Sequence, residues 1–404
     1  MSAKQPASLG AAAARPIHEP VRLNWGRLTS ISFLLVALGV IGVAAGLASG
    51  NSQRVWSSWL VNWLFFTGIA EGGVVCSAAF YLTQARWAGT AQYRLAEAWW
   101  RFLPLAFVLF LGVFIGRNEI FPWIAHPSPK QAMWLNVPFL FARDYLALGI
   151  VTLMAWWFVG ASSSRAAEEW HGRPETIEMP PKAIRRLAPA VGILFAIVWT
   201  LFAFDLISSL APRWHSTLFG WWYFATVFWS NIVAMSFTAV RMRTALPSGN
   251  TFERGKVRHD LGKMIFAFSI FWMYLTFAQY IVIWYADLPS ETFFIVARCW
   301  HHPWMFLSWM TPVLLWVVPF FTLLGVKPKK TPAILGTVAL LGLIGVWDLN
   351  YILVVPSLSP DKLPLGWIEL CVTAGFLGAF LLCATPGLKT LANVAAADAA
   401  GGER

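Results

Sequence analysis

The sequence lacks the residue patterns that hold redox centres. Its four cysteines have no CxxC spacing, and Cys76, Cys371 and Cys383 lie within strongly apolar runs. An iron–sulfur cluster needs four cooperating thiolates and a c-type haem needs a CxxCH motif, so the sequence excludes both. The seven histidines fall in loops or at the ends of apolar runs, where no two could clamp a haem iron in mid-membrane. We therefore expect the chain to carry no redox centre and no covalently bound cofactor.

Charged residues are also scarce. Of the 404 residues only 12% are charged, 58% are hydrophobic and 25 are tryptophan. With a mean hydropathy of +0.61, this is more apolar surface than one soluble core could bury. Ten runs are long enough to cross a hydrocarbon layer of about 30 Å, so we predict an all-α integral membrane protein. The predicted spans are 29–49, 57–83, 102–119, 138–159, 188–209, 218–240, 264–286, 303–325, 331–355 and 366–385.

Basic residues are distributed unevenly between the predicted loops. An even number of spans puts both termini on one side, and only seven of the 30 lysines and arginines belong to the other side. The positive-inside rule then predicts that both termini are cytoplasmic. The net charge of +11 reflects short basic loops beside the inner leaflet, so nucleic acid is not an expected partner. The seven exceptions are Arg54, Arg117, Lys130, Arg143, Arg213, Arg298 and Lys362.

A weak internal repeat at an offset of 161 residues relates the segment at 123–128 to the segment at 284–290. It maps the first four spans onto the next four, which predicts two parallel four-helix bundles with two extra helices. The predicted organisation is a flexible cytoplasmic arm at 1–27, a first repeat at 28–160, a cytoplasmic linker at 161–187, a second repeat at 188–326, two further helices at 327–386 and a disordered tail at 387–404.

Three carboxylates, Glu71, Asp205 and Asp348, stand inside apolar runs. A charged group at the bilayer centre costs about 3 kcal/mol, so such groups usually face the protein interior or a wet cavity. Glu71 lies among glycines, where it either hydrogen-bonds a closely packed helix or relays protons. Asp205 is followed by Ser208 and Asp348 by Tyr351, and hydroxyl neighbours can hold a water chain. These five residues are our candidates for a proton pathway.

A second polar layer lies at the non-cytoplasmic ends of the spans. Two interpretations remain open: a rim that docks an extramembrane partner, or a quinone headgroup site with one donor and one acceptor beside apolar walls. Its members are His126, Arg143, Asp144, His215 and Asp287. Glu369, at the mouth of the last span, is expected to be solvated instead.

Several motifs closely resemble those of the ActF-type membrane subunits of bacterial alternative complex III, within the polysulfide-reductase-type NrfD membrane family. The resemblance runs from the first predicted span to the last, and ordered matches in several loops are more specific than shared hydrophobicity. The matching segments are Leu95–Ala98, Trp134–Phe139 with Arg143, Asp205–Leu210, Pro212 and Trp214, Ser216–Gly220, His259–Lys263, Ile283–Ala286 and Trp347–Leu349.

The resemblance implies a subunit of a quinol:electron-acceptor oxidoreductase in the inner membrane of a bacterium. In such complexes quinol is oxidised, electrons leave through iron–sulfur clusters and c-type haems of partner subunits, and the energy is thought to drive proton translocation. The expected partners are a sister NrfD-like membrane subunit, an iron–sulfur subunit, c-type cytochrome subunits, membrane lipids and a terminal oxidase. The sister subunit carries the better-supported quinol site, so this chain is not expected to be the catalytic subunit.

Three alternatives to a proton-conducting role remain open at this point. The chain could be a passive membrane anchor for periplasmic redox subunits, or a subunit that binds a quinone, either menaquinone or ubiquinone. A secondary transporter built on parallel repeats is disfavoured, because the middles of the spans have few of the Gly- or Pro-broken segments that form midplane substrate sites.

Overall fold

The computed structural model describes residues 24–85, 87–127, 129–164, 167, 179–246 and 248–401, and it has no strands in these segments. Ten of its helical stretches are long and apolar enough to cross a membrane. An α-helix satisfies every backbone hydrogen bond within its own segment, which is what a lipid environment demands. The prediction of an all-α membrane protein with ten spans is confirmed.

The ten spans have the following bounds along the chain. They are α1 (Trp25–Ala48), α2 (Ser52–Leu82), α3 with η1 and α4 (Thr90–Ala96, Glu97–Trp99, Phe102–Ile115), α7 (Val137–Ser162), α9 with η2 and η3 (Lys182–Phe202, Ala203–Ile207, Ser208–Leu210), α10 (Phe219–Ala245), α11 (Gly255–Ala286), α13 with η5 and α14 (Met305–Pro312, Val313–Val317, Val318–Thr322), α16 (Pro332–Leu358) and α17 (Trp367–Gly401). Short helices in the connections are α5 (Arg117–Ile120), α6 (Pro122–Ala125), η4 (Thr251–Glu253), α12 (Pro289–Cys299) and α15 (Val326–Lys330).

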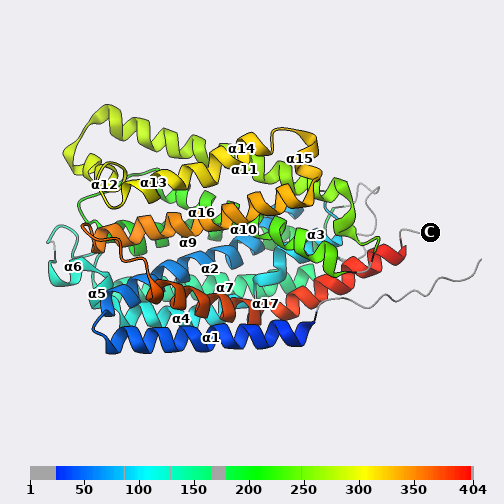
Figure 1. The fold of residues 1–404 in the computed structure, drawn as a ribbon, viewed down its shortest axis with the longest axis horizontal. Helices are drawn as coiled ribbons and strands as arrows, with labels where there is room; N and C mark the ends of the chain where they lie inside the picture. The colour runs from blue at the N-terminus through cyan, green and yellow to red at the C-terminus, as the bar shows by residue number, and fades with distance from the viewer. Residues whose placement is uncertain are drawn as a thin grey trace, which may run out of the picture.

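The spans run side by side, so the molecule has two ends (Figure 1). The described chain begins at α1 and finishes at α17 on the same end, which also carries α3 and α15 and which we call the terminal end. Helices α5, α6 and α12 lie at the opposite end, which we call the far end. Both ends of the described part of the chain therefore share one side of the bundle, as an even number of spans requires.

Two four-helix bundles form the centre of the protein. The first contains α2, α4, α7 and α9, and the second contains α10, α11, α13 and α16. Helix α2 packs against α10 and α16 as well as its own bundle, so it joins the two. Its membrane-spanning window is 94% buried, against 22% for α1. Helix α1 packs chiefly on α17, and this pair lies against the first bundle through α2 (Figure 1).

This grouping differs from the predicted repeats, which placed the first span in the first bundle and the fifth in the second. The fifth span, α9, instead completes the first bundle, and α1 lies outside it. The reason is a close backbone contact between α1 and α17. A Cβ atom at Gly39 would lie 2.3 Å from the Cα of Gly375, so the two backbones touch where neither has a side chain.

The segment predicted as a disordered tail, 387–404, is helical as far as Gly401, since α17 continues to that residue. Alanine has the highest helix propensity, and the tail is rich in it. The start of this segment is also packed, because a Cβ at Gly387 would meet the carbonyl oxygen of Ala98 at 2.3 Å. Residues 402–404, residues 1–23 of the predicted arm, and residues 165, 166 and 168–178 of the predicted linker lie outside the described residues.

Two glycines let α2 come close to its neighbours at mid-membrane. A Cβ at Gly72 would lie 2.7 Å from the carbonyl oxygen of Val227 on α10, and one at Gly73 would lie 2.2 Å from the carbonyl oxygen of Ala96. Backbone atoms cannot move aside as a flexible side chain can. The contact of α2 with α10 therefore depends on the absence of a side chain at Gly72, and its contact with α3 depends on the absence of one at Gly73.

We predict that Gly72→Ala destabilises the protein by about 1–3 kcal/mol, because the added methyl group overpacks this contact. Gly192→Ala is the matched control: it also lies within a helix, and a Cβ there meets nothing within 4 Å. The control is expected to be neutral or slightly stabilising, since alanine favours helix. Unfolding curves of the purified variants in the same detergent measure both effects. Equal stabilities of the two variants would contradict the close approach of α2 and α10.

Candidate functional site

The far end of the first bundle contains a buried ion pair between Asp205 and Arg143. Asp205 lies in η2, a wide π-helical turn that ends α9, and it is fully buried. Arg143 of α7 donates from Nε to Oδ2 and from Nη2 to Oδ1, both at 2.6 Å. Its guanidinium lies 4.0 Å from the ring centre of Trp134, whose Nε1 donates to Asp205 Oδ1 at 2.9 Å. A two-pronged pair capped by an indole is a rigid arrangement.

Asp144 adds a second carboxyl group to this cluster. It is fully buried, neither carboxyl oxygen has a hydrogen-bond partner among the described residues, and it interacts electrostatically with Asp205 and Arg143. Arg143 and Asp144 are neighbours in sequence and do not pair along α7; Arg143 reaches across to α9 instead. The cluster therefore places two carboxyl groups beside one cation.

The structure separates the other members of the predicted outer layer from this cluster. His126, His215 and Asp287 are exposed at the far end of the molecule. Asp287 ends α11 in the left-handed conformation, with φ 45°. Only Arg143 and Asp144 come together with Asp205.

Asp348 lies in α16 and is 7% exposed. Thr311 of α13 donates to its Oδ2 at 2.8 Å. The next turn holds Tyr351, which is buried, stacks on Trp347 at 5.2 Å and has a hydroxyl with no partner in the described part of the chain. Ser208 points elsewhere: its hydroxyl donates to the carbonyl of Trp214 at 3.2 Å. Tyr351 thus remains beside Asp348, whereas Ser208 is engaged in a local turn.

The prediction that Glu369 is solvated is wrong. Its side chain is 1% exposed and pairs with Arg54 of α2, with Nη2–Oε2 at 2.8 Å and Nε–Oε1 at 3.0 Å. Sequence alone could not show this pair, because 315 residues separate its members. Tyr351 interacts electrostatically with Glu369, Arg54 and Asp348. A second group of polar residues therefore joins α2, α16 and α17.

Glu71 occupies the middle of α2, between the two bundles. It is 3% exposed, and its Oε2 has no hydrogen-bond partner in the described segments. Thr67, one helical turn away on the same face, is 1% exposed and its hydroxyl is likewise without a partner. Buried polar atoms in such a position are usually satisfied by ordered water. Glu71 and Thr67 thus place two unpartnered polar atoms on one face of α2.

A buried polar network at the terminal end was missed by reasoning from sequence. Glu97 accepts from Ser77 at 2.6 Å and pairs with Arg94 at 2.9 Å. Arg94 also donates to the Ser162 carbonyl and the Ser163 hydroxyl, both at 2.8 Å. Glu97 belongs to the matched segment Leu95–Ala98, but both Glu97 and Arg94 precede the predicted third span, so the sequence did not indicate that they are buried. Their spacing of three residues at the start of a helix was the available signal.

This network lines a cavity of about 250 Å³ at the terminal end. The polar residues around it are Arg94, Glu97, Arg101, Ser163 and Thr390. Glu97 lies at the inner side of the cavity, because it is buried while Arg101 and Thr390 are exposed. The terminal end therefore has a partly polar cavity with a buried carboxylate in its wall.

Between Glu97 and Glu71 lies Asn231 of α10. Its side-chain oxygen accepts from Trp99 at 2.9 Å, and it would lie 3.2 Å from a Cβ at Gly73. Toward the far end, Asn62 of α2 accepts from Trp347 Nε1 at 3.1 Å, next to Asp348 in sequence. Polar side chains therefore occur at intervals along α2 from one end of the membrane span to the other.

No protein-family model and no curated protein matches this chain. In the described segments there is also no group of three or more His, Cys, Asp or Glu residues placed to hold a metal ion.

We predict that Arg143→Met destabilises the protein by about 3–5 kcal/mol, because it leaves Asp205 buried without its cation. Asp205→Leu should cost a similar amount by stranding Arg143. The double variant should be much more stable than the sum of the two losses implies, since it leaves neither charge behind. Unfolding free energies in mixed micelles give the coupling, with Arg213→Met, at an exposed arginine of the same end, as the control. Simple additivity would contradict the ion pair.

Proposed function

We propose that this chain is an ActF-type membrane subunit of a bacterial respiratory quinol:electron-acceptor oxidoreductase of the alternative complex III type, and that it conducts protons for that complex. The observation that carries the proposal is the series of buried carboxyl groups at different depths: Glu97, Glu71, Asp348 and the Asp144–Asp205 pair. Intramembrane ionisable residues on protein-facing surfaces are the usual components of proton relays.

The proposed path begins at the terminal-end cavity, where Glu97 takes up a proton. A rise of about 1.5 Å per residue places Ser77, the partner of Glu97, about 9 Å along α2 from Glu71. It places Asn62 about 13 Å from Glu71 on the other side. Water beside Asn231 and Thr67 would bridge these gaps, because both residues present polar groups in otherwise apolar surroundings.

At the far end the path has two candidate exits. Asp348 is the exit more directly connected to α2, because its neighbour Trp347 donates a hydrogen bond to Asn62 of α2. The Asp144–Asp205 pair belongs to the first bundle, and its surplus carboxyl group could hold a proton before release. Electrons would travel in the iron–sulfur and cytochrome subunits that the family resemblance implies, with a sister membrane subunit beside this one.

The competing proposal is a passive membrane anchor. It is favoured by one observation, the exposed polar residues His126, His215 and Asp287 at the far end, which would suit a docking rim for extramembrane partners. It does not account for Glu71 and Thr67, whose unpartnered polar atoms lie buried at mid-membrane. A passive anchor would gain no stability from these groups, because burying an unpartnered polar atom costs free energy.

We predict that Glu71→Gln slows proton uptake by the complex in vesicles by on the order of 100-fold, because the amide cannot exchange a proton. Asp348→Asn should have an effect in the same direction. Asp287→Asn is the matched control, since this carboxylate is exposed and lies off the path. The measurement is the proton-to-electron ratio during quinol oxidation, with subunit composition checked by electrophoresis. Normal assembly with an unchanged ratio in both test variants would leave the anchor as the better account.

A further inference from the structure

The terminal-end cavity has more positive than negative charge in its wall. Among the described residues, its ionisable groups are those of Arg94, Arg101 and Glu97. Arg94 pairs with Glu97, with Nη1–Oε2 at 2.9 Å, so these two charges balance each other. Arg101 lies 5.5 Å from the ring centre of Trp100 and makes no hydrogen bond or ion pair with the described residues. One positive charge in the wall is therefore without a counter-ion in the part of the chain that the structure describes.

The same wall contains a hydroxyl group that can donate to a ligand. Ser163 Oγ accepts a hydrogen bond from Arg94 Nη1 at 2.8 Å, and its own hydrogen has no acceptor among the described residues. Thr390 differs, because its hydroxyl donates to the carbonyl of Pro386 at 3.1 Å. Ser163 and Arg101 both line the cavity and both are exposed. A guanidinium and a hydroxyl hydrogen are two donors that suit the oxygens of an anion.

One edge of the cavity faces the bilayer. Trp156 of α7 lines the cavity and is 57% exposed. A tryptophan near the end of a spanning helix is typical of the interface between hydrocarbon and water. Exposed apolar side chains continue from there along one face of α7 at helical spacing: Trp157, Leu153, Ile150 and Leu146. A ligand of this cavity would therefore have its anionic part inside and an apolar part in the lipid.

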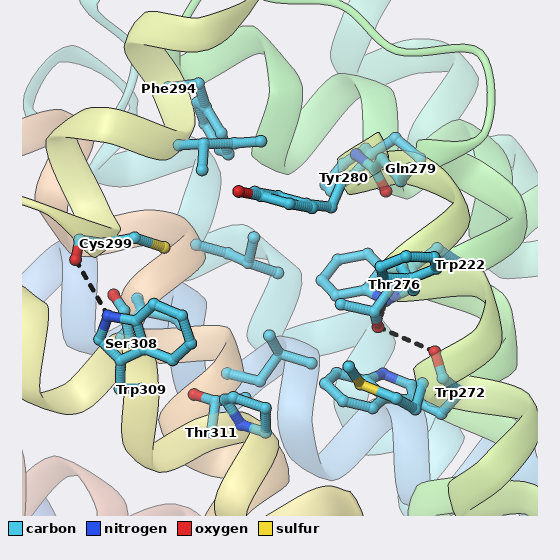
Figure 2. Close-up of a pocket in the computed structure, with 18 of the residues that line it drawn as sticks. Trp222, Trp272, Thr276, Gln279, Tyr280, Phe294, Cys299, Ser308, Trp309 and Thr311 are labelled. Carbon is cyan, nitrogen blue, oxygen red and sulfur yellow. Dashed lines mark hydrogen bonds between the residues drawn. The ribbon is translucent and has the colours of Figure 1, made fainter. Parts of the chain in front are cut away.

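The larger cavity, in the second bundle, has a different character. It has a volume of about 370 Å³ and lies between α10, α11, α12, α13 and α16. Its wall is mainly aromatic and aliphatic, with a few hydroxyl groups such as that of Ser308 (Figure 2). No lysine, arginine or histidine of the described chain lines it, so an anion there would be buried without a cation. Of the two cavities, only the one at the terminal end has charge to offer an anionic ligand.

We propose that the terminal-end cavity binds the phosphate group of an acidic phospholipid, with Arg101 and Ser163 as the donors and an acyl chain lying along α7. Basic pockets between spanning helices suit acidic headgroups, because they combine positive charge with access from the bilayer. The planar guanidinium of Arg101 can present two parallel donors to a phosphate. The exposed ring of Trp156 would lie at the level where the headgroup meets the acyl chains.

The lipid site goes beyond the proposed proton path and does not rest on it. Both use the terminal-end cavity, but the phosphate would lie at the exposed mouth beside Arg101, whereas Glu97 is buried at the inner side. A water molecule occupies about 30 Å³ in the liquid. The cavity of about 250 Å³ therefore admits a phosphate group together with water. Lipid binding can be measured on the chain without any assay of proton uptake.

Native mass spectrometry of the full chain tests the site. The purified chain is stripped of lipid in detergent and titrated with phosphatidylglycerol or phosphatidylcholine carrying the same acyl chains. We expect the first phosphatidylglycerol to bind on the order of tenfold more tightly than the first phosphatidylcholine, because the choline group of the latter cancels the charge that Arg101 would attract. Equal affinities for the two lipids overturn the proposal without any variant.

Arg101→Gln should weaken binding of the first phosphatidylglycerol by about tenfold, the effect of one lost charge-assisted hydrogen bond. The variant should fold normally, because Arg101 is exposed and has no bond within the described chain to lose. Arg185→Gln is the matched control, since Arg185 is an exposed arginine near the start of α9 and lines neither cavity. An equal loss in both variants, or none in Arg101→Gln, overturns the proposal, because the lipid would then be attracted by surface charge elsewhere.

Soluble phosphates distinguish a lipid from a free ligand of the same chemistry. Inorganic phosphate and glycerol 3-phosphate are added to the chain with one phosphatidylglycerol bound. We expect neither to displace the lipid at concentrations up to 100 times that of the lipid, roughly, because neither gains the apolar contact along α7. Displacement at a concentration equal to that of the lipid overturns the lipid assignment and indicates a site for a soluble phosphate.

Discussion

The contact between α2 and α10 is the constraint on which the arrangement of this protein depends. Membrane helices gain little from hydrophobic burial against one another, so they associate through close packing and polar contacts. Gly72 and Gly73 allow that packing, and they bring Glu71 and Asn231 into the same buried region. The residues that hold the two bundles together are thus sequence neighbours of the central acid.

Burial in an apolar environment determines where the remaining polar groups lie. Each is either paired closely, as Arg143 with Asp205 and Arg54 with Glu369, or left with an unpartnered atom beside other polar groups. Unpartnered atoms occur both at the far end, in Asp144, and near the middle of α2, in Glu71 and Thr67.

Hydropathy was sufficient to predict the number of spans, because a stretch that crosses lipid must be apolar along most of its length. It could not predict which helices pack together: α1 is apolar all round, and only the matching glycine of α17 identifies its neighbour. An isolated acid such as Glu71 is easily recognised because apolar residues surround it in the sequence. The burial of Glu97 could not be predicted, because Glu97 precedes the predicted third span. The cavity around Ser308 combines side chains from five helices, and such a combination exists only after folding.

The pairing of α1 with α17 has a consequence for how the protein is made. Helix α1 precedes both bundles along the chain and its main partner, α17, follows them, so both bundles can assemble before α1 and α17 meet. Insertion of α17 then brings this pair together against α2. A variant truncated before α17 would leave a glycine-lined face of α1 open to other membrane proteins.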